Sequence, residues 1–565
     1  MHSHLHWGLL VGLAAVLALL AKLALSARTG GTIDVVYWQQ FLAGINAGGG
    51  AGIYAHHELF NHPPFMIHFL RALGALQGWS GAPFVFLLRL PGIFADVGTV
   101  ALVWALRERL APTPVHPAAI VLLALAPASL MISGYHGNTD SLMIFFVVLG
   151  VFLAERYPAS WPAGTALGMA LCIKIAAAIF LPVFVLSRRR QRDKVTLLSA
   201  AAMTFVVAST PYLYGNAHLI ARRVLGYAGG ATPWGAPLLF DVVRQQALDA
   251  LLANQPAVPL SSALWLYRVA GRAGAAYAAW SRPALLAALC LLAWWLNRPS
   301  RRLPLFTQCA ITACLFLVFA PGFGVQYLAW VVPWVAAAGA LVAAPFHLTS
   351  AALLYWLYRT DYFGAPTASG RSLLCWAAIG AVLAACLRYA AAGGRRRRGA
   401  PAMALAGAAA LVAAALWSAP RPASDNDRPL VIASSTHAGS SPGAAVDGRS
   451  DPSEWPSDGW HSNGTPRPEA PEVLTFVFPH RRAIERIGLA AFPDPQLTLD
   501  SFVFQAASAA GWRDIDATRV AHNTVATSWT FTVPHLDTEL VRLRIDGAAD
   551  AYARVLEVQF SDGSD

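Results

Sequence analysis

Residues 7–26 read WGLLVGLAAVLALLAKLALS, a nearly unbroken apolar stretch that is long enough to cross a lipid bilayer as a helix. The whole chain has the same character: 56% of its 565 residues are hydrophobic and only 13% are charged, whereas soluble proteins average about 25% charged. The mean hydropathy is +0.49. This composition predicts a membrane protein with many spanning helices. Residues 7–26 are too long and too poorly flanked for a cleaved signal, so we expect them to remain as the first helix.

Further apolar stretches of suitable length follow along most of the chain. The good candidates for spanning helices are 84–106, 116–133, 195–214, 275–296, 304–320, 325–345, 372–391 and 401–418. Residues 141–155 and 347–358 are weaker candidates. Together with a pair of short helices in 163–187, they predict an α-helical polytopic domain of about 13 helices over residues 1–418.

The balance of charge changes sharply near Pro420. Residues 1–418 carry a net charge of +19, and residues 419–565 carry a net charge of −8. In the first part the basic residues form short clusters between apolar stretches, which is typical of cytoplasmic loops. The high pI therefore gives no reason to expect nucleic acid as a partner. The clusters are Arg107 with Arg109, residues 188–194, residues 298–302 and residues 395–398.

One stretch conflicts with this pattern of charge. A single helix over 163–187 would put the 188–194 cluster on the outer side and Lys174 in mid-membrane, at a cost of about 2.5–3.5 kcal/mol. A break at Lys174 into two short half-helices removes both problems. The alternative is one continuous helix with a snorkelling lysine. With the break, we expect a cytoplasmic N-terminus in a multi-pass plasma-membrane protein, and an extracytoplasmic chain after about Trp417.

Under this topology, unusual polar residues collect on the outer side. Asp34 lies just past the first helix, and only two other acids occur in the first 107 residues. A double proline in the same outer loop, 27–83, predicts the start of a juxtamembrane amphipathic helix over 65–78. The other candidate site residues of this loop are Tyr37, Glu58 and His62.

Three later segments carry further candidate substrate-binding residues. His136, Asn138 and Asp140 lie in one turn, where a simple turn with a helix N-cap is the alternative and explains Asp140 but not His136 beside Asn138. Basic side chains elsewhere are suited to bind a phosphate or diphosphate, with contacts to lipid headgroups as the alternative. These basic residues are Lys174, Arg222 and Arg223, and the last outer segment adds Gln326 and Tyr327.

The order of these motifs resembles the GT-C superfamily of polytopic membrane glycosyltransferases, especially the mannosyltransferase branch that uses polyprenyl-phosphate sugars. The similarity covers roughly residues 1–390. Its motifs are the acid after the first helix, His62-Pro63-Pro64 before a juxtamembrane helix, Gly137-Asn138-Thr139-Asp140-Ser141, the lysine between paired short helices, and Gly324-Val325-Gln326-Tyr327-Leu328-Ala329-Trp330.

The resemblance implies inverting transfer of a sugar from a polyprenyl-phosphate donor to an acceptor hydroxyl at the extracytoplasmic face. Asp34 would take the role of the family's first-loop acid and act as general base, with Glu58 as the second candidate. The family's first loop often carries two neighbouring acids, whereas Val35-Val36 follow Asp34 here. This departure argues against a metal-dependent reaction, and we expect no required cofactor.

The C-terminal part has the pattern of an all-β domain. Residues 419–430 are rich in Pro, Asp and Ser and predict a linker. Short alternating or apolar runs follow, separated by turn signals, which predicts a sandwich or jelly roll over 431–565. The domain contains none of the six cysteines and must fold without disulfides. The runs are 473–478, 484–492, 501–506, 528–533, 540–545 and 555–560.

This domain resembles F5/8 type C (discoidin, galactose-binding-like) modules. The matching landmarks are Ala444-Ala445-Val446-Asp447-Gly448, Gly459-Trp460, Gly511-Trp512-Arg513-Asp514-Ile515 and Val555-Leu556-Glu557-Val558. The resemblance implies glycan binding, with Trp455, Trp460 and His461 as candidates for stacking on a sugar; core packing is the alternative. It also implies a structural calcium near Asp447 and Glu557, and a simple Asp-Gly turn is the alternative there.

The favoured function is therefore transfer of a mannose-like hexose, with a polyprenyl-phosphate sugar, a glycan or glycolipid acceptor and the lipid bilayer as partners. A pentosyl (arabinofuranosyl) transferase of cell-wall assembly is the alternative enzyme. The non-enzymatic alternative is a transporter of lipid-linked glycans or a glycan-binding membrane protein. Transporters of this size usually contain internal repeats, and we find none in the sequence.

Overall fold

The computed structural model describes residues 2–111, 115–226, 234–253, 258–298, 303–359, 368–392, 428–449, 457–494, 496, 498–508, 511–523 and 527–562. The chain forms two compact units. The first comprises Met1–Leu239 and Ala276–Ala415, and the second comprises Phe240–Ala275 and Leu416–Asp565.

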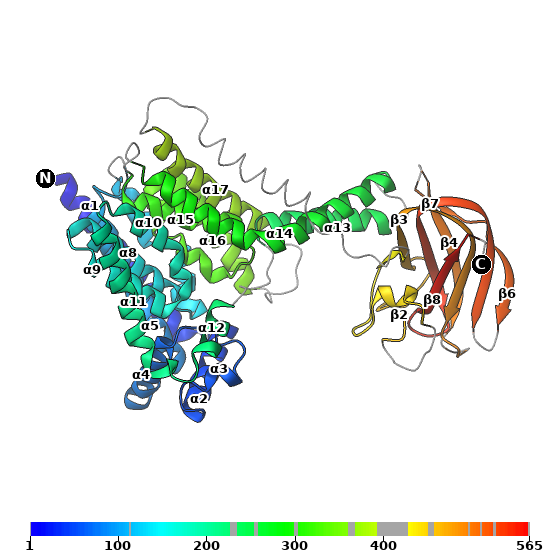
Figure 1. Ribbon diagram of the computed structural model, residues 1–565, viewed down its shortest axis with the longest axis horizontal. Helices are drawn as coiled ribbons and strands as arrows, with labels where there is room; N and C mark the ends of the chain where they lie inside the picture. Colours follow the sequence, from blue (N-terminus) through cyan, green and yellow to red (C-terminus); the bar gives the residue numbers. More distant parts are fainter. Residues whose placement is uncertain are drawn as a thin grey trace. The chain divides into compact units, whose positions relative to one another are not determined.

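The first unit is helical (Figure 1). Seven helices among the described residues are long and apolar enough to cross a membrane, which agrees with the predicted polytopic architecture. These candidate spans lie in α1 (His2–Arg28), α5 (Phe84–Leu106), the segment Pro117–His136, α11 (Gln191–Leu213), α14 (Leu260–Leu296, which also enters the second unit), α16 (Ala340–Arg359) and α17 (Ala368–Ala392). The other helices of this unit are α2 (Ile33–Ala47), α3 (Ile53–His56), α4 (Phe65–Ser80), α6 (Pro117–Ala124), α7 (Pro127–Met131), α8 (Asp140–Arg156), α9 (Trp161–Ile173), α10 (Leu181–Ser187), α12 (Ala217–Leu225) and α15 (Leu305–Phe319), of which α6 and α7 belong to the segment Pro117–His136.

The predicted break at Lys174 is confirmed in the backbone. Lys174 itself is extended, with φ −152° and ψ 124°, and it separates α9 from the 3-10 helix η2 (Ile175–Phe180), which leads into α10. The backbone therefore leaves the helical path at the one charged residue of the apolar stretch. The predicted helix over 65–78 is also confirmed, as α4.

The predicted spanning helix over 325–345 is wrong. This stretch forms two buried 3-10 helices, η3 (Val325–Trp330) and η4 (Trp334–Ala338), before α16 begins at Ala340. Pro333 precedes η4, and Gly339 ends it with a positive φ of 82°, which a residue with a side chain rarely adopts. The weaker candidate 347–358 is instead the second half of α16. The candidate 401–418 and the cluster 395–398 lie outside the described residues.

The second unit is built on one antiparallel sheet, which confirms the all-β prediction. The strand order is β2-β8-β3-β7-β4-β5, with β1 paired to β3 and β6 paired to β7. The two longest strands merge runs that were expected to be separate, because register shifts such as the one between Val477 and Arg482 bend a strand without ending it. The strands are β1 (Leu430–Ala433), β2 (Trp460–His461), β3 (Glu472–Ala491), β4 (Leu499–Ser508), β5 (Gly511–Asp514), β6 (Thr518–Asn523), β7 (Ser528–Ala548) and β8 (Arg554–Ser561).

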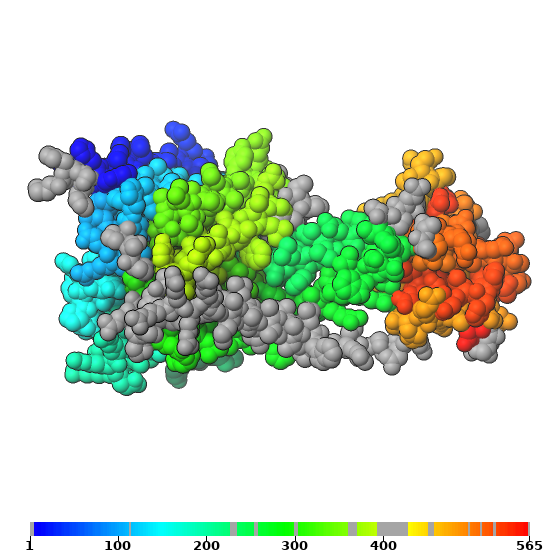
Figure 2. Space-filling model, turned by 90° about the horizontal axis from the view of Figure 1, so that it is seen from above, coloured from blue at the N-terminus to red at the C-terminus, as the bar shows by residue number. Residues whose placement is uncertain are grey.

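A helical hairpin belongs to this second unit. It consists of α13 (Ala236–Leu252) and the first half of α14, and it lies against the sheet, green beside orange and red in Figure 2. Its apolar side chains pack on Ile432, Val477 and Leu540. Arg542 of β7 donates from Nη1 to the carbonyls of Leu252 and Ala253, at 3.3 Å each. The guanidinium thus caps the C-terminal end of α13, where a positive charge is favoured.

Candidate active site

The candidate site is centred on Asp34, in the first turn of α2. Its Oδ2 atom lies 3.0 Å from Nε2 of His136 and accepts a hydrogen bond of 2.8 Å from Nδ2 of Asn138. The carboxylate remains 26% exposed. Within the described part of the chain Oδ1 accepts no hydrogen bond, so this second oxygen is available to a substrate.

The segment that carries His136 is folded as a π-helix, η1 (Ile132–His136). It ends at Gly137, which has a φ of 82°. The chain turns there in close contact with α2, since a Cβ atom on Gly137 would lie 2.6 Å from the side chain of Val35. Nδ1 of His136 meets the hydroxyl of Tyr358 at 2.9 Å, and the backbone amide of Thr139 donates to Oδ1 of Asn138 at 2.7 Å. These bonds from Tyr358 and Thr139 hold the side chains of His136 and Asn138 in the orientation in which both contact Asp34.

A second carboxylate, that of Asp140, lies two residues after Asn138. Asp140 is fully buried at the start of α8, and both of its oxygens lie 2.9 Å from Nζ of Lys174. The indole nitrogen of Trp330 also donates to Asp140. Lys174 lies over the ring of Tyr327, 5.7 Å from its centroid, and its side chain is 13% exposed. The structure thus brings together Asp140, Lys174 and Tyr327, three residues singled out from the sequence.

The charges around Asp34 favour its ionised form. Burial alone would raise the pKa of Asp34, but the interaction with His136, the bond from Asn138 and the charge of Lys174 together hold the pKa below its ordinary value of 3.8. His62 is buried beside this cluster and lies 4.4 Å from the ring of Trp38. Burial and the charge of Lys174 lower the pKa of His62 to about 3, against the opposing effect of Asp34, so His62 is neutral.

The sequence analysis missed two residues of this site, Tyr358 and Trp330, and also the buried Arg89. Tyr358 and Trp330 contact His136 and Asp140 across 222 and 190 residues of chain, and only Trp330 lay within a motif that we had noted. Arg89 of α5 is 1% exposed and donates to the carbonyls of Ser26 and Thr29 at the end of α1. A guanidinium within an apolar stretch is itself a signal of a functional or structural site.

Among the other predicted residues, Glu58 and Arg223 pair with each other. The side chain of Glu58 is 87% exposed and lies 3.7 Å from Arg223, which also donates to the carbonyl of Tyr54. Glu58 thus pairs with Arg223 and makes no contact with Asp34 among the described residues, so this geometry does not support Glu58 as the base. Arg222 is exposed, whereas Tyr37 and Gln326 are half-buried. Among the described residues, no group of three or more His, Cys, Asp or Glu side chains is arranged to hold a metal ion.

Comparison with known proteins bears on the helical part. Residues 60–321 match the model of glycosyltransferase family 87. The chain carries a family 87 glycosyltransferase domain. His62, His136, Asn138, Asp140 and Lys174 fall within the match, and the chain is thus a membrane glycosyltransferase. No curated protein matches the chain.

Solved structures also match part of the chain. One is a chain of the Streptococcus pneumoniae β-galactosidase BgaA, with 15% identity, a TM-score of 0.21 and coverage of 23% of this chain and 90% of that one. Another is the family 32 CBM of Clostridium perfringens NanJ in complex with galactose, with 14% identity, a TM-score of 0.19 and coverage of 24% and 97%.

Beyond the family 87 domain, two of the three predicted sugar-stacking residues of the sandwich, Trp460 and His461, are not on its surface. Trp460 is fully buried, and its indole nitrogen donates to the carbonyl of Ser435 at 3.0 Å. His461 is 1% exposed and lies 2.9 Å from Asp458. Both side chains are buried, and Trp460 belongs to the hydrophobic core of the domain. Trp455 lies outside the described residues.

The predicted calcium ligands are close to one another. Oε2 of Glu557 accepts a hydrogen bond of 3.2 Å from the amide of Gly448, the residue after Asp447. Burial and the neighbouring Asp447 raise the pKa of Glu557 to about 7, although the bond from Gly448 and the charge of Arg428 oppose this. A cation between the carboxylates of Asp447 and Glu557 would offset the repulsion between their negative charges, so calcium binding remains a prediction for this place.

Glu557 predicts how the stability of the sandwich changes with pH. Its folded pKa is about 7 against an ordinary 4.5, so the folded state binds the proton more tightly and stability falls as the pH rises from about 4.5 to about 7. Glu557→Gln should remove this loss, and calcium should offset it in the wild type alone. Amide hydrogen exchange of the 554–561 peptide in the full chain measures both effects. Faster exchange at pH 8 in Glu557→Gln than in the wild type would contradict the prediction.

Proposed function

We propose that the enzyme transfers a sugar from a polyprenyl-phosphate donor to an acceptor hydroxyl at the extracytoplasmic face, with inversion at the anomeric carbon. The donor is a mannose-like hexose in the favoured case. The observation that carries the proposal is the partly exposed carboxylate of Asp34, which His136 and Asn138 hold on one oxygen. The charge of Lys174 also acts on this carboxylate and helps to lower its pKa.

In this reaction Oδ1 of Asp34 accepts the proton of the acceptor hydroxyl as its oxygen attacks the anomeric carbon. The bond from that carbon to the phosphate oxygen breaks on the opposite face, and the polyprenyl phosphate leaves with the electron pair. Lys174 stabilises the charge that develops on the phosphate, because an ammonium strengthens its interaction as the leaving oxygen becomes more negative. His62 is neutral and adds no competing charge.

The test is transfer by the purified full chain from radiolabelled polyprenyl-phosphate mannose and polyprenyl-phosphate arabinofuranose, with cell-envelope glycans as acceptors. We expect a labelled glycan from one donor, and inverted anomeric configuration in its NMR spectrum. Retained configuration would contradict a general base at Asp34 and favour a covalent intermediate. No transfer from any donor of this class would favour the transporter alternative.

We propose that the sandwich holds the glycan acceptor. Its described surface offers half-buried aromatic rings near a charged side chain: His437 packs against Tyr552 at 5.9 Å, and Arg554 lies 5.5 Å from the ring centre of Phe492. Aromatic faces beside a donor-rich guanidinium suit the apolar face and hydroxyls of a sugar ring. Loss of glycan binding in Tyr552→Ala, measured with a polysaccharide affinity gel, tests this assignment.

A further inference from the structure

A buried polar cluster joins three helices of the first unit. Nζ of Lys22 in α1 lies 2.6 Å from Oδ2 of Asp96 in α5 and 2.6 Å from the hydroxyl of Ser129 in α7. The hydroxyl of Ser129 also donates to Asp96 at 2.7 Å. Lys22 is 2% exposed, and Asp96 provides the opposite charge beside it within the helix bundle. Charged side chains in membrane helices are costly and usually functional.

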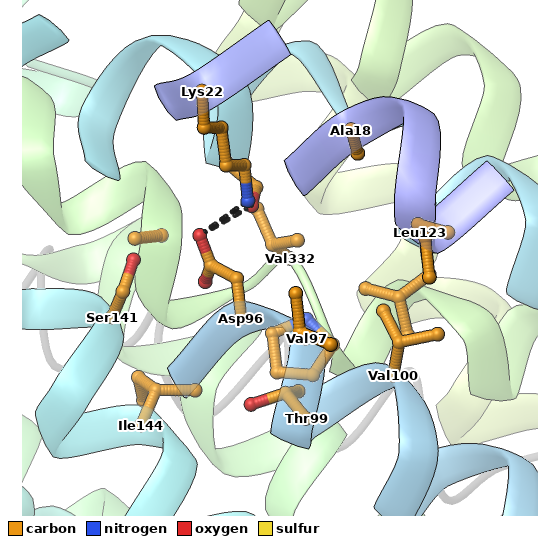
Figure 3. A pocket seen from close by; sticks show the side chains of 15 residues that line it. Ala18, Lys22, Asp96, Val97, Thr99, Val100, Leu123, Ser141, Ile144 and Val332 are labelled. Atoms are coloured by element: carbon orange, nitrogen blue, oxygen red, sulfur yellow. Dashed lines mark hydrogen bonds and ion pairs between the residues drawn. The ribbon is translucent and has the colours of Figure 1, made fainter. Parts of the chain in front are cut away.

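The cluster borders a small cavity of about 20 Å³ (Figure 3). Asp96 lines this cavity together with Ser141, the second residue of α8. The hydroxyl of Ser141 is buried and has no hydrogen-bond partner among the described residues. The cavity has room for one water molecule between these two polar groups. The cluster therefore includes Ser129 of α7 and borders the start of α8 at Ser141.

The segment from Ser129 to Ser141 contains His136 and Asn138 of the candidate site. The carbonyl of Ser129 accepts a hydrogen bond of 2.7 Å from Ser133, the second residue of the π-helix η1. A Cβ atom on Gly134 would lie 3.3 Å from Cα of Lys22, so the π-helix packs directly on α1 at the lysine. A Cβ atom on Gly92, one turn before Asp96 in α5, would lie 3.7 Å from Ser133 and from the carbonyl of Asn138.

We propose that Lys22, Asp96 and Ser129 are positioning residues that fix the π-helix and thereby hold His136 and Asn138 against Asp34. The geometry leaves residues 129–141 two anchors, the Ser129 hydroxyl at one end and the packing beside Asp96 and Gly92 at the other. A π-helix is an uncommon conformation that persists where its surroundings fix it. The proposal rests on the proposed function only for its effect on the reaction.

Ser129→Ala is the sharpest test, because it removes the hydroxyl that links the ion pair to α7 and leaves Lys22 and Asp96 paired. We expect faster amide hydrogen exchange in the peptide 130–138 of the full chain, a fall in kcat of about tenfold, and an unchanged KM for the polyprenyl-phosphate donor. The acid limb of the pH–rate profile, which reports the pKa of Asp34, should move to higher pH, because His136 no longer lowers that pKa in full. The variant His136→Ala should show the same shift. The charged or titratable groups around Asp34 are His62, His136 and Lys174.

Two variants complete the test. Ser129→Thr keeps a hydroxyl and should restore both the exchange and the pH profile. Thr312→Val removes another buried hydroxyl, bonded at 2.9 Å to the carbonyl of Gln308 in α15, and should change neither. Wild-type exchange and a wild-type pH profile in Ser129→Ala would overturn the proposal. If the wild type transfers no sugar, the proposed function fails, while the exchange experiment still decides the positioning role.

Discussion

Asp34→Asn lowers the rate of sugar transfer by about 10²–10⁴-fold in the expected result, which is the usual contribution of a general base. The amide has nearly the shape of the carboxylate but no basic oxygen to accept the acceptor proton. Asp34→Ala should lose as much or more, because His136 and Asn138 then lose their shared partner. The measurement is single-turnover transfer from a radiolabelled polyprenyl-phosphate sugar.

Glu58→Gln is the matched control for this prediction. Glu58 lies in the same loop, but its side chain is 87% exposed and its partner is Arg223, so transfer should remain near the wild-type rate. The melting temperature of Asp34→Asn should also stay near that of the wild type, since Asp34 is partly exposed. Near-normal transfer by both Asp34 variants, or a loss confined to Glu58→Gln, would remove Asp34 as the base.

Lys174→Met should have the largest effect on stability. It leaves the fully buried carboxylate of Asp140 without its cation, and breaking such a pair typically costs about 3–5 kcal/mol. Trp330 still donates to Asp140, but one indole bond cannot replace an ammonium that meets both oxygens. The melting temperature of the full chain in detergent should therefore fall clearly, together with transfer activity.

The double variant Lys174→Met/Asp140→Asn separates stability from function. It removes both charges and should recover most of the lost melting temperature, since no unpaired charge remains buried. Transfer should stay low, because Lys174 is the cation proposed to stabilise the leaving phosphate. Recovery of both properties would show that Lys174 serves only to neutralise Asp140.

Several elements follow from the sequence because their causes are local. The break at Lys174 could be predicted from the cost of an ammonium in a bilayer and from the charge of the next loop. The helix α4 follows from its double proline and apolar pattern, and the β domain from alternating runs between turns. The stretch 325–345 shows the limit of hydropathy: it is apolar because it is buried in protein, and its backbone is not a spanning helix.

The sequence by itself therefore determined the membrane class, the broken helix and the all-β domain, and it singled out Asp34 as the candidate catalytic acid. Only the tertiary structure decided that Asp34 meets His136 across 102 residues, and that Lys174 pairs with Asp140. It also placed Trp460 and His461 in the core of the sandwich. The physical reason is that hydropathy and periodicity act on neighbouring residues through solvent and backbone. Contacts between distant segments depend on how helices and strands pack, and no short stretch of sequence specifies that packing.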